Sequence, residues 1–222
     1  MTRFPNRSEA GRALGAELSR RYPGNGAEAL VLALPRGGVP VGYEVARALG
    51  IRLDVFVVRK LGVPGHEELA MGAIASGGVR VLNEDVISMA GVSPDQIERV
   101  TQREEQELQR REQSYRGAGE PIDVAGKRVF LVDDGLATGS TMRAAVRALR
   151  AMHAGEVMVA VPVAAPETCE QLREEADDVV CLLTPAAFYA VGLWYEDFSQ
   201  TSDEEVKALL QRARSGGAAP FQ

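Results

Sequence analysis

The 222-residue sequence has few cysteines, few aromatic residues and no long apolar segment. Its two cysteines, Cys169 and Cys181, lack the spacing of a zinc site and are too few for a disulfide scaffold, so we expect both to be structural thiols in or near the core. No apolar run reaches the roughly 18 residues that a membrane-spanning helix requires. The first residues turn polar too early for a secretory signal. We therefore expect a cytoplasmic protein with no membrane partner.

The charge balance excludes another class of partner. Asp and Glu number 31 and Lys and Arg number 25, which gives a net charge of -6. A chain of this sign is not drawn to the phosphate backbone of DNA or RNA, so no nucleic-acid partner is expected. The 45% of hydrophobic residues is typical of a globular domain. We expect one domain over residues 1–215, followed by a disordered tail at residues 216–222.

Short apolar runs alternate with helical patterns along most of the chain. The runs that predict buried strands lie at residues 28–35, 53–60, 128–134, 157–164 and 178–183. Helical periodicity marks residues 8–21, with Ser8 as the expected N-cap, and residues 39–50, 141–155 and 166–176. This order predicts an α/β fold, in which a mainly parallel, twisted sheet carries helices on both faces.

Two segments interrupt the alternation between the second and third of these strands. Residues 70–83 predict a small hairpin that turns at Gly77 and Gly78. Residues 93–115 predict a long charged helix within a helical insertion at about residues 84–120. Such a helix is typical of a solvated element that lies across the domain or against a partner subunit. In the second arrangement the partner would be another copy of the chain, and the protein would be a homodimer.

Unusual residues follow three of the predicted strands. They are a Pro-Arg-Gly-Gly turn at residues 35–38, an Arg-Lys pair at residues 59 and 60, and an Asp-Asp pair that opens a loop of small residues at 133–141. Ligands of open parallel sheets bind beyond the carboxyl ends of the strands, so these loops should share one rim. Taken singly, each is also typical of an ordinary turn or of solvated charge.

The loop after the Asp-Asp pair is typical of a phosphate site. It runs into a helix, whose first backbone N–H groups are unpaired and favour an anion. Small residues allow close approach and hydroxyl groups add donors, and the residues concerned are Ala137, Thr138, Gly139, Ser140 and Thr141. Asp133 and Asp134 would repel a phosphate, so we expect them to accept hydrogen bonds from sugar hydroxyls or to face a metal ion that the ligand brings.

The basic loops indicate a second anion. Arg36, the backbone N–H groups of Gly37 and Gly38, and the side chains of Arg59 and Lys60 would bind it. A sugar that carries a phosphate at one end and a pyrophosphate at the other would satisfy all three loops.

The segment VFLVDDGLATGST resembles the phosphoribosyl-pyrophosphate motif of the type I phosphoribosyltransferases. The resemblance implies a core at about residues 28–185 and a hood built from residues 1–25 and 185–212. It also implies that Asp133 and Asp134 bind the ribose hydroxyls, that residues 137–141 bind the 5-phosphate, and that residues 35–38 bind pyrophosphate, with a non-proline cis peptide at Arg36.

Mg²⁺ is implied with the pyrophosphate, near Asp133 and Asp134 but only in indirect contact with them. Arg36, Lys60, Asp133 and Asp134 would carry the catalysis, and a mobile covering loop would lie within residues 62–127.

The acceptor is not identified by the sequence. The hood of the family binds it, and aromatic side chains stack well on a flat base, so Phe188, Trp194 and Tyr195 are the candidates here. The alternative is that these rings pack the C-terminal helix onto the sheet. The predicted function is transfer of 5-phosphoribosyl to a nitrogenous, nucleobase-like acceptor with release of pyrophosphate. The alternatives are a non-catalytic nucleotide or phosphoribosyl-pyrophosphate sensor of the same fold, or an unrelated phosphate-binding α/β protein.

Overall fold

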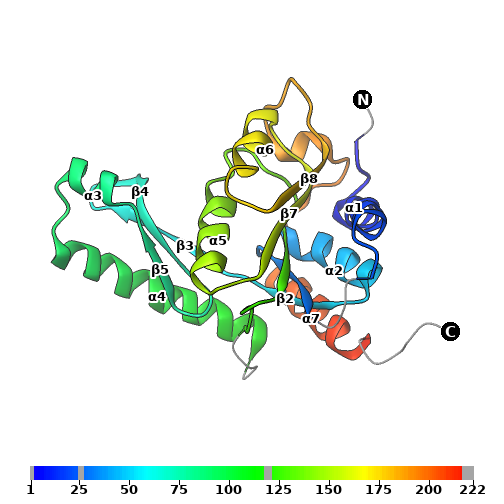
Figure 1. The fold of residues 1–222 in the computed structure, drawn as a ribbon, viewed down its shortest axis with the longest axis horizontal. Helices are drawn as coiled ribbons and strands as arrows, with labels where there is room; N and C mark the ends of the chain where they lie inside the picture. Colours follow the sequence, from blue (N-terminus) through cyan, green and yellow to red (C-terminus); the bar gives the residue numbers. More distant parts are fainter. Residues whose placement is uncertain (1–2, 25–27, 118–121, 217–222) are drawn as a thin grey trace.

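A five-stranded parallel sheet forms the centre of the protein, with strand order β2–β1–β6–β7–β8 (Figure 1). The structure is a computed structural model that describes residues 3–24, 28–117 and 122–216. The strands of this sheet are β1 (Ala29–Ala33), β2 (Arg52–Val55), β6 (Arg128–Val132), β7 (Glu156–Val163) and β8 (Asp178–Leu183). Every pair of neighbours is parallel, as the alternation of strands and helices predicts.

Helices cover both faces of this sheet. The first face carries α1 (Arg7–Arg21), α2 (Gly38–Leu49) and α7 (Asp203–Gly216), and the second carries α5 (Ser140–Ala151) and α6 (Pro166–Leu172). Side chains alternate along each strand. On β1, Val31 and Ala33 therefore join the core of the first face, whereas Leu30 and Leu32 join the core of the second. The predicted α/β class is confirmed.

A second, antiparallel sheet and two helices extend to one side of the central sheet (Figure 1). We call this part the arm. It consists of β3 (Val58–Val63), β4 (His66–Ala75), β5 (Val79–Leu82), α3 (Glu84–Ala90) and α4 (Pro94–Arg116). The predicted hairpin turns at Gly77 and Gly78, which both have positive φ, and its two strands pack against α5. The predicted charged helix is α4, which begins with a capping box at Ser93.

The strand predicted at residues 53–60 is wrong, because the chain changes sheets within it. The amide of Phe56 still donates to the carbonyl of Ala33 in the parallel sheet, whereas the amide of Val57 donates to the hydroxyl of Ser76. The segment therefore divides into β2 and β3. As a result, Arg59 and Lys60 lie within a strand of the arm and not at the end of a parallel strand.

Three smaller expectations also change or go untested. The first helix begins at Arg7, because Asn6 and not Ser8 accepts the hydrogen bond that caps it. Cys169 on α6 and Cys181 on β8 form a disulfide, so the expectation of two thiols is wrong. The spacing of the two cysteines in the sequence does not reveal that α6 places the sulfur of Cys169 against that of Cys181 on β8. The expected disordered tail lies, except for its first residue, outside the described residues.

No helix in the described part of the chain has both the length and the apolar character needed to cross a membrane.

Candidate functional site

The two adjacent aspartates lie at the end of β6, close to the rim of the parallel sheet. The Oδ2 atom of Asp134 accepts a hydrogen bond of 2.8 Å from Nε of Arg7, and Oδ1 of Asp133 accepts one of 2.8 Å from the amide of Asp134. The second oxygen of each carboxylate has no partner among the described residues. These oxygens are therefore available to a ligand.

Burial shifts the protonation of this pair. It raises the pKa of Asp133 well above the ordinary value, and the charge of Asp134 raises it further. Burial also raises the pKa of Asp134, while the hydrogen bond from Arg7 opposes that rise. Two desolvated carboxylates side by side disfavour full ionisation. A ligand that donates hydrogen bonds to them, or that brings a cation close, would favour the ionised forms.

The Pro-Arg-Gly-Gly turn joins β1 to α2 and packs directly against these acids. A Cβ atom on Gly37 would lie 2.1 Å from Oδ2 of Asp134, so any other residue there would displace that carboxylate. The Pro35–Arg36 peptide is cis, as the family resemblance implies. The amide of Gly38 donates to the carbonyl of Leu34, so the expectation that it serves an anion is wrong. Gly37 and Arg36 keep amides without a partner among the described residues.

The loop that follows the acids has backbone amides that are not used in hydrogen bonds within the described structure. Leu136 anchors its start by donating its amide to the carbonyl of Val163 at 2.9 Å. Gly139 then adopts the left-handed conformation (φ 67°) and serves as the N-cap of α5. Within the described structure, the amides of residues 137–141 donate to no protein acceptor, and the side chains of Ala137, Thr138, Ser140 and Thr141 are exposed. This is the arrangement that an anion at a helix N-terminus requires.

Lys60 belongs to the same neighbourhood although it comes from the arm. A cavity of about 300 Å³ separates the arm from the first turns of α5. Lys60 of β3 lines it on one side, and Thr138, Ser140, Arg143 and Arg147 line it on the other. Arg143 and Arg147 both pair with Glu175, so among the described residues Lys60 is the cavity's one cationic side chain without an ion pair.

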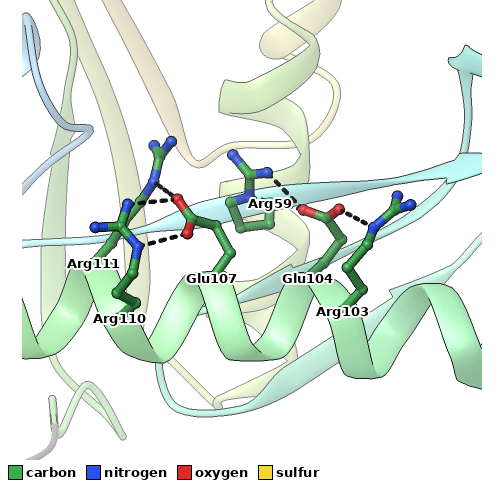
Figure 2. Close-up of polar contacts among 6 residues, drawn as sticks. All are labelled: Arg59, Arg103, Glu104, Glu107, Arg110 and Arg111. Carbon is green, nitrogen blue, oxygen red and sulfur yellow. Dashed lines mark hydrogen bonds and ion pairs between the residues drawn. The ribbon is translucent and has the colours of Figure 1, made fainter.

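Arg59 points elsewhere. Its guanidinium binds Glu104 of α4, with Nη2 at 2.6 Å and Nε at 2.9 Å from Oε2, as Figure 2 shows. The other oxygen of Glu104 accepts from Arg103 of the same helix. Because side chains alternate along a strand, β3 sends Arg59 towards α4 and Lys60 towards α5. The expectation that the two residues serve one anion together is not met in this conformation.

The sequence matches the model of the phosphoribosyl transferase domain over residues 2–196. The chain belongs to this family. It is 46% identical over 213 residues to a Mycobacterium tuberculosis (strain H37Rv) protein whose name provisionally assigns it to the phosphoribosyl transferases. That match covers 96% of this chain and 47% of the relative, so the chain spans about half of the relative's length.

Two further relatives of this phosphoribosyl transferase domain are a solved structure and a shorter sequence match. The crystal structure of the protein TT1426 from Thermus thermophilus is 42% identical and superposes with a TM-score of 0.84, covering 94% of this chain and 98% of that one. A shorter match of 69 residues, 38% identical, covers 30% of this chain and 32% of a uracil phosphoribosyltransferase from a Nocardioides species.

The aromatic side chains of the domain's C-terminal part are divided between its interior and its surface, where Tyr189 is 84% exposed. Trp194 and Tyr195 are only 8% and 3% exposed and pack with Phe188 against Ala10 of α1 and Val163 of β7. The alternative that these rings pack the C-terminal helix onto the sheet is therefore wrong about the helix, because the helix that they pack against is α1. Tyr195 also reaches the site, since its hydroxyl donates to the carbonyl of Asp134 at 2.6 Å. Burial raises the pKa of that hydroxyl, which therefore stays a donor.

Arg7 and Arg36 connect the site to more distant segments. Arg7 contacts Asp134, donates to the carbonyl of Ser199 at 2.7 Å and stacks on the ring of Phe198 at 3.8 Å. Nothing in the sequence indicates this role, because an arginine in the first turn of a helix is ordinary. Arg36 lies 3.9 Å from Oδ1 of Asp203 at the start of α7.

Proposed function

We propose that this domain transfers the 5-phosphoribosyl group of phosphoribosyl pyrophosphate to a nitrogenous, nucleobase-like acceptor and releases pyrophosphate. The observation that supports this most directly is the adjacency of two features. Residues 137–141, whose amides have no acceptor in the described structure, closely follow Asp133 and Asp134. One oxygen of each of these carboxylates likewise has no described partner and lies at the same rim. A phosphorylated sugar requires an anion site and acceptors for its hydroxyl groups at the same rim.

The 5-phosphate would bind in the loop of residues 137–141. Its oxygens would accept from the backbone amides at the start of α5, where the helix dipole also favours negative charge. The hydroxyl groups of Thr138, Ser140 and Thr141 are exposed and add further donors. The ribose hydroxyls would donate to the free oxygens of Asp133 and Asp134.

The pyrophosphate would bind between the turn at residues 35–38 and the arm. Gly37 and Arg36 would supply amides, since theirs have no partner among the described residues. Lys60, which lines the cavity between the arm and α5, would supply a charge from the arm. Lys60 makes no ion pair within the described residues, so an anionic ligand would not have to displace a carboxylate. Within the described part of the chain, the one ion pair of Arg36 is the long contact with Asp203, which a pyrophosphate could replace.

A magnesium ion fits this site only together with the ligand. No three Asp, Glu, His or Cys side chains gather as a metal site in residues 3–24, 28–117 and 122–216. Mg²⁺ commonly binds substrate phosphates, one or two carboxylates and water. Asp133 and Asp134 could face such an ion through water. Bound in this way, the ion would neutralise charge on the departing pyrophosphate.

In the proposed reaction, a nitrogen atom of the acceptor forms a bond to the anomeric carbon as the bond from that carbon to the pyrophosphate oxygen breaks. The electron pair of that bond leaves with pyrophosphate, so positive charge develops on the sugar and negative charge on the leaving group, and a proton carried by the acceptor nitrogen passes to water. Asp133 and Asp134 would stabilise the sugar cation and hold the ring. Lys60 and Arg36 would stabilise the leaving group. Preorganised charges of this kind each contribute a few kcal/mol of transition-state stabilisation.

Calorimetry with magnesium and phosphoribosyl pyrophosphate tests the donor site. We expect binding by the wild type and its loss in the Asp133→Ala, Asp134→Ala double variant with the fold retained. Unchanged affinity in that variant would contradict the site assignment. Pyrophosphate release across a panel of purines, pyrimidines and small amines then tests turnover. Tight donor binding without release from any acceptor would favour a sensor of the same fold.

A further inference from the structure

Thr168 of α6 contacts the phosphate-type loop at two points. Its hydroxyl donates to the carbonyl of Ala137 at 2.6 Å. Its methyl group lies against Gly139, where an added Cβ would come within 2.5 Å of it. Thr168 is 7% exposed and lies 31 residues beyond Ala137, so nothing near the loop in sequence marks it.

The first contact decides which way one peptide faces. The carbonyl of Ala137 and the amide of Thr138 belong to the same planar peptide unit, in which they point in opposite directions. A hydroxyl that holds the carbonyl towards α6 therefore turns the Thr138 amide away from α6 and towards the open side of the loop. That amide has no acceptor within the described residues, although it belongs to the loop proposed to bind the 5-phosphate.

Contacts on both sides of Thr168 hold it in place. The amide of Ala165, just before α6, donates to the carbonyl of Leu136 at 2.9 Å, so the loop and the helix are joined one residue ahead of the peptide in question. Cys169, next to Thr168, is bonded to Cys181 of β8. The hydroxyl of Thr168 is thus held at a fixed distance from the sheet. The peptide that it orients is fixed in turn.

We propose that Thr168 is a positioning residue that aims the backbone amide of Thr138 at the 5-phosphate of the ligand. The inference rests on the proposed function and adds a residue that does not touch the ligand. A preorganised donor binds an anion without the cost of reorienting its peptide, and this advantage disappears when the carbonyl is released. The effect should be confined to the 5-phosphate end of the ligand, because pyrophosphate would bind to residues that Thr168 does not contact.

The test compares two ligands, ribose 5-phosphate and magnesium pyrophosphate, by calorimetry on the full chain. Thr168→Val keeps the shape of the side chain but removes the donor, and Thr168→Ser restores it. Thr101→Val is the matched control, since Thr101 of α4 is also buried (6% exposed) and its hydroxyl accepts from Arg80 in the arm. We expect Thr168→Val to weaken ribose 5-phosphate binding about tenfold, as loss of one hydrogen bond to a charged group would. Magnesium pyrophosphate binding should not change, and Thr168→Ser and Thr101→Val should bind both ligands like the wild type.

An unchanged affinity of Thr168→Val for ribose 5-phosphate would overturn the inference, and so would an equal loss for both ligands. If the wild type bound neither ligand, the proposed function would fail, and this inference with it. If Thr168→Val does not fold, titration of the wild type decides, because the amide proton signal of Thr138 in an NMR spectrum should move downfield on addition of ribose 5-phosphate. A signal that does not move would overturn the inference.

Discussion

Nε of Arg7 lies 2.8 Å from Oδ2 of Asp134, although 127 residues separate the two along the chain. Both side chains are largely covered, at 12% and 14% exposure, so the ion pair is screened little by water. It ties the first helix to the acid that is proposed to hold the ribose. Loss of the arginine would leave a covered carboxylate without its cation.

Arg7→Met should therefore destabilise the protein at neutral pH by about 2 kcal/mol, because an unpaired buried charge is costly. The effect should depend on pH. Arg7 stabilises the ionised form of Asp134, so its contribution is present at high pH and is lost as pH falls through the pKa of Asp134. Because burial raises that pKa, the loss should occur above the ordinary range of an aspartate. Urea denaturation of both proteins across acid and neutral pH measures the difference.

Arg20→Met is the control for this change. Arg20 lies in the same helix and pairs with Glu17, and its side chain is 72% exposed. Exposed pairs contribute less than about 1 kcal/mol. If Arg7→Met destabilised the protein no more than Arg20→Met, or equally at every pH, the pairing with Asp134 would not explain its role.

Asp133→Asn should make the free protein more stable at neutral pH while it removes donor binding. The folded-state pKa of Asp133 is raised by burial and by Asp134. Such a group contributes its full stability below its unfolded pKa and loses it as pH rises through the folded value. The amide of asparagine does not ionise and still accepts from the backbone amide of Asp134. Thermal unfolding in metal-free buffer should show a gain that grows from acid to neutral pH.

Asp123→Asn tests the opposite sign. Hydrogen bonds from Lys127 and from the amide of Ala125 lower the pKa of this exposed aspartate. Its small contribution is therefore present above its unfolded pKa, and the amide should lose it at neutral pH. A midpoint that fell in Asp133→Asn, or that rose equally in both variants, would contradict the effect of burial on Asp133.

The sequence was sufficient for the parallel sheet and for the loops at 35–38 and 133–141, because apolar runs and their polar ends are local features. Other features depend on contacts that no local pattern contains. The change of sheets at Val57 depends on the hydroxyl of Ser76, and the site contacts of Arg7 and Thr168 come from elements 127 and 31 residues away from their partners. Both Arg59 and Lys60 were assigned to the pyrophosphate, and that role of Lys60 stays a prediction, whereas Arg59 pairs with Glu104, since the arm turns the two side chains apart.

Gly139→Ala should weaken ribose 5-phosphate binding at least tenfold and destabilise the protein by about 1–2 kcal/mol. Gly139 has a φ of 67°, which strains any residue with a Cβ, and that Cβ would also press on Thr168 at 2.5 Å. Gly126→Ala is the matched control, because Gly126 has a φ of 68° but nothing within 4 Å of the added atom. Gly126→Ala should introduce the same backbone strain but leave the affinity for ribose 5-phosphate unchanged. If calorimetry gave Gly139→Ala and Gly126→Ala equal affinities for ribose 5-phosphate, the shape of the loop at Gly139 would not matter for binding of the anion.

Lys60→Met and Arg59→Met should separate binding from stability. Lys60 lines the cavity beside Thr138 and makes no ion pair among the described residues, so its loss should weaken binding of magnesium pyrophosphate about tenfold and leave the unfolding midpoint nearly unchanged. Arg59 instead holds Glu104, which is almost buried, so its loss should lower the midpoint more than it lowers affinity (Figure 2). Because the effect at Lys60 is electrostatic, it should shrink as salt is raised. If Arg59→Met proved the weaker binder of the two, the arm would have to rotate Arg59 from α4 to the ligand, and the conformation described here would not be the one that binds pyrophosphate.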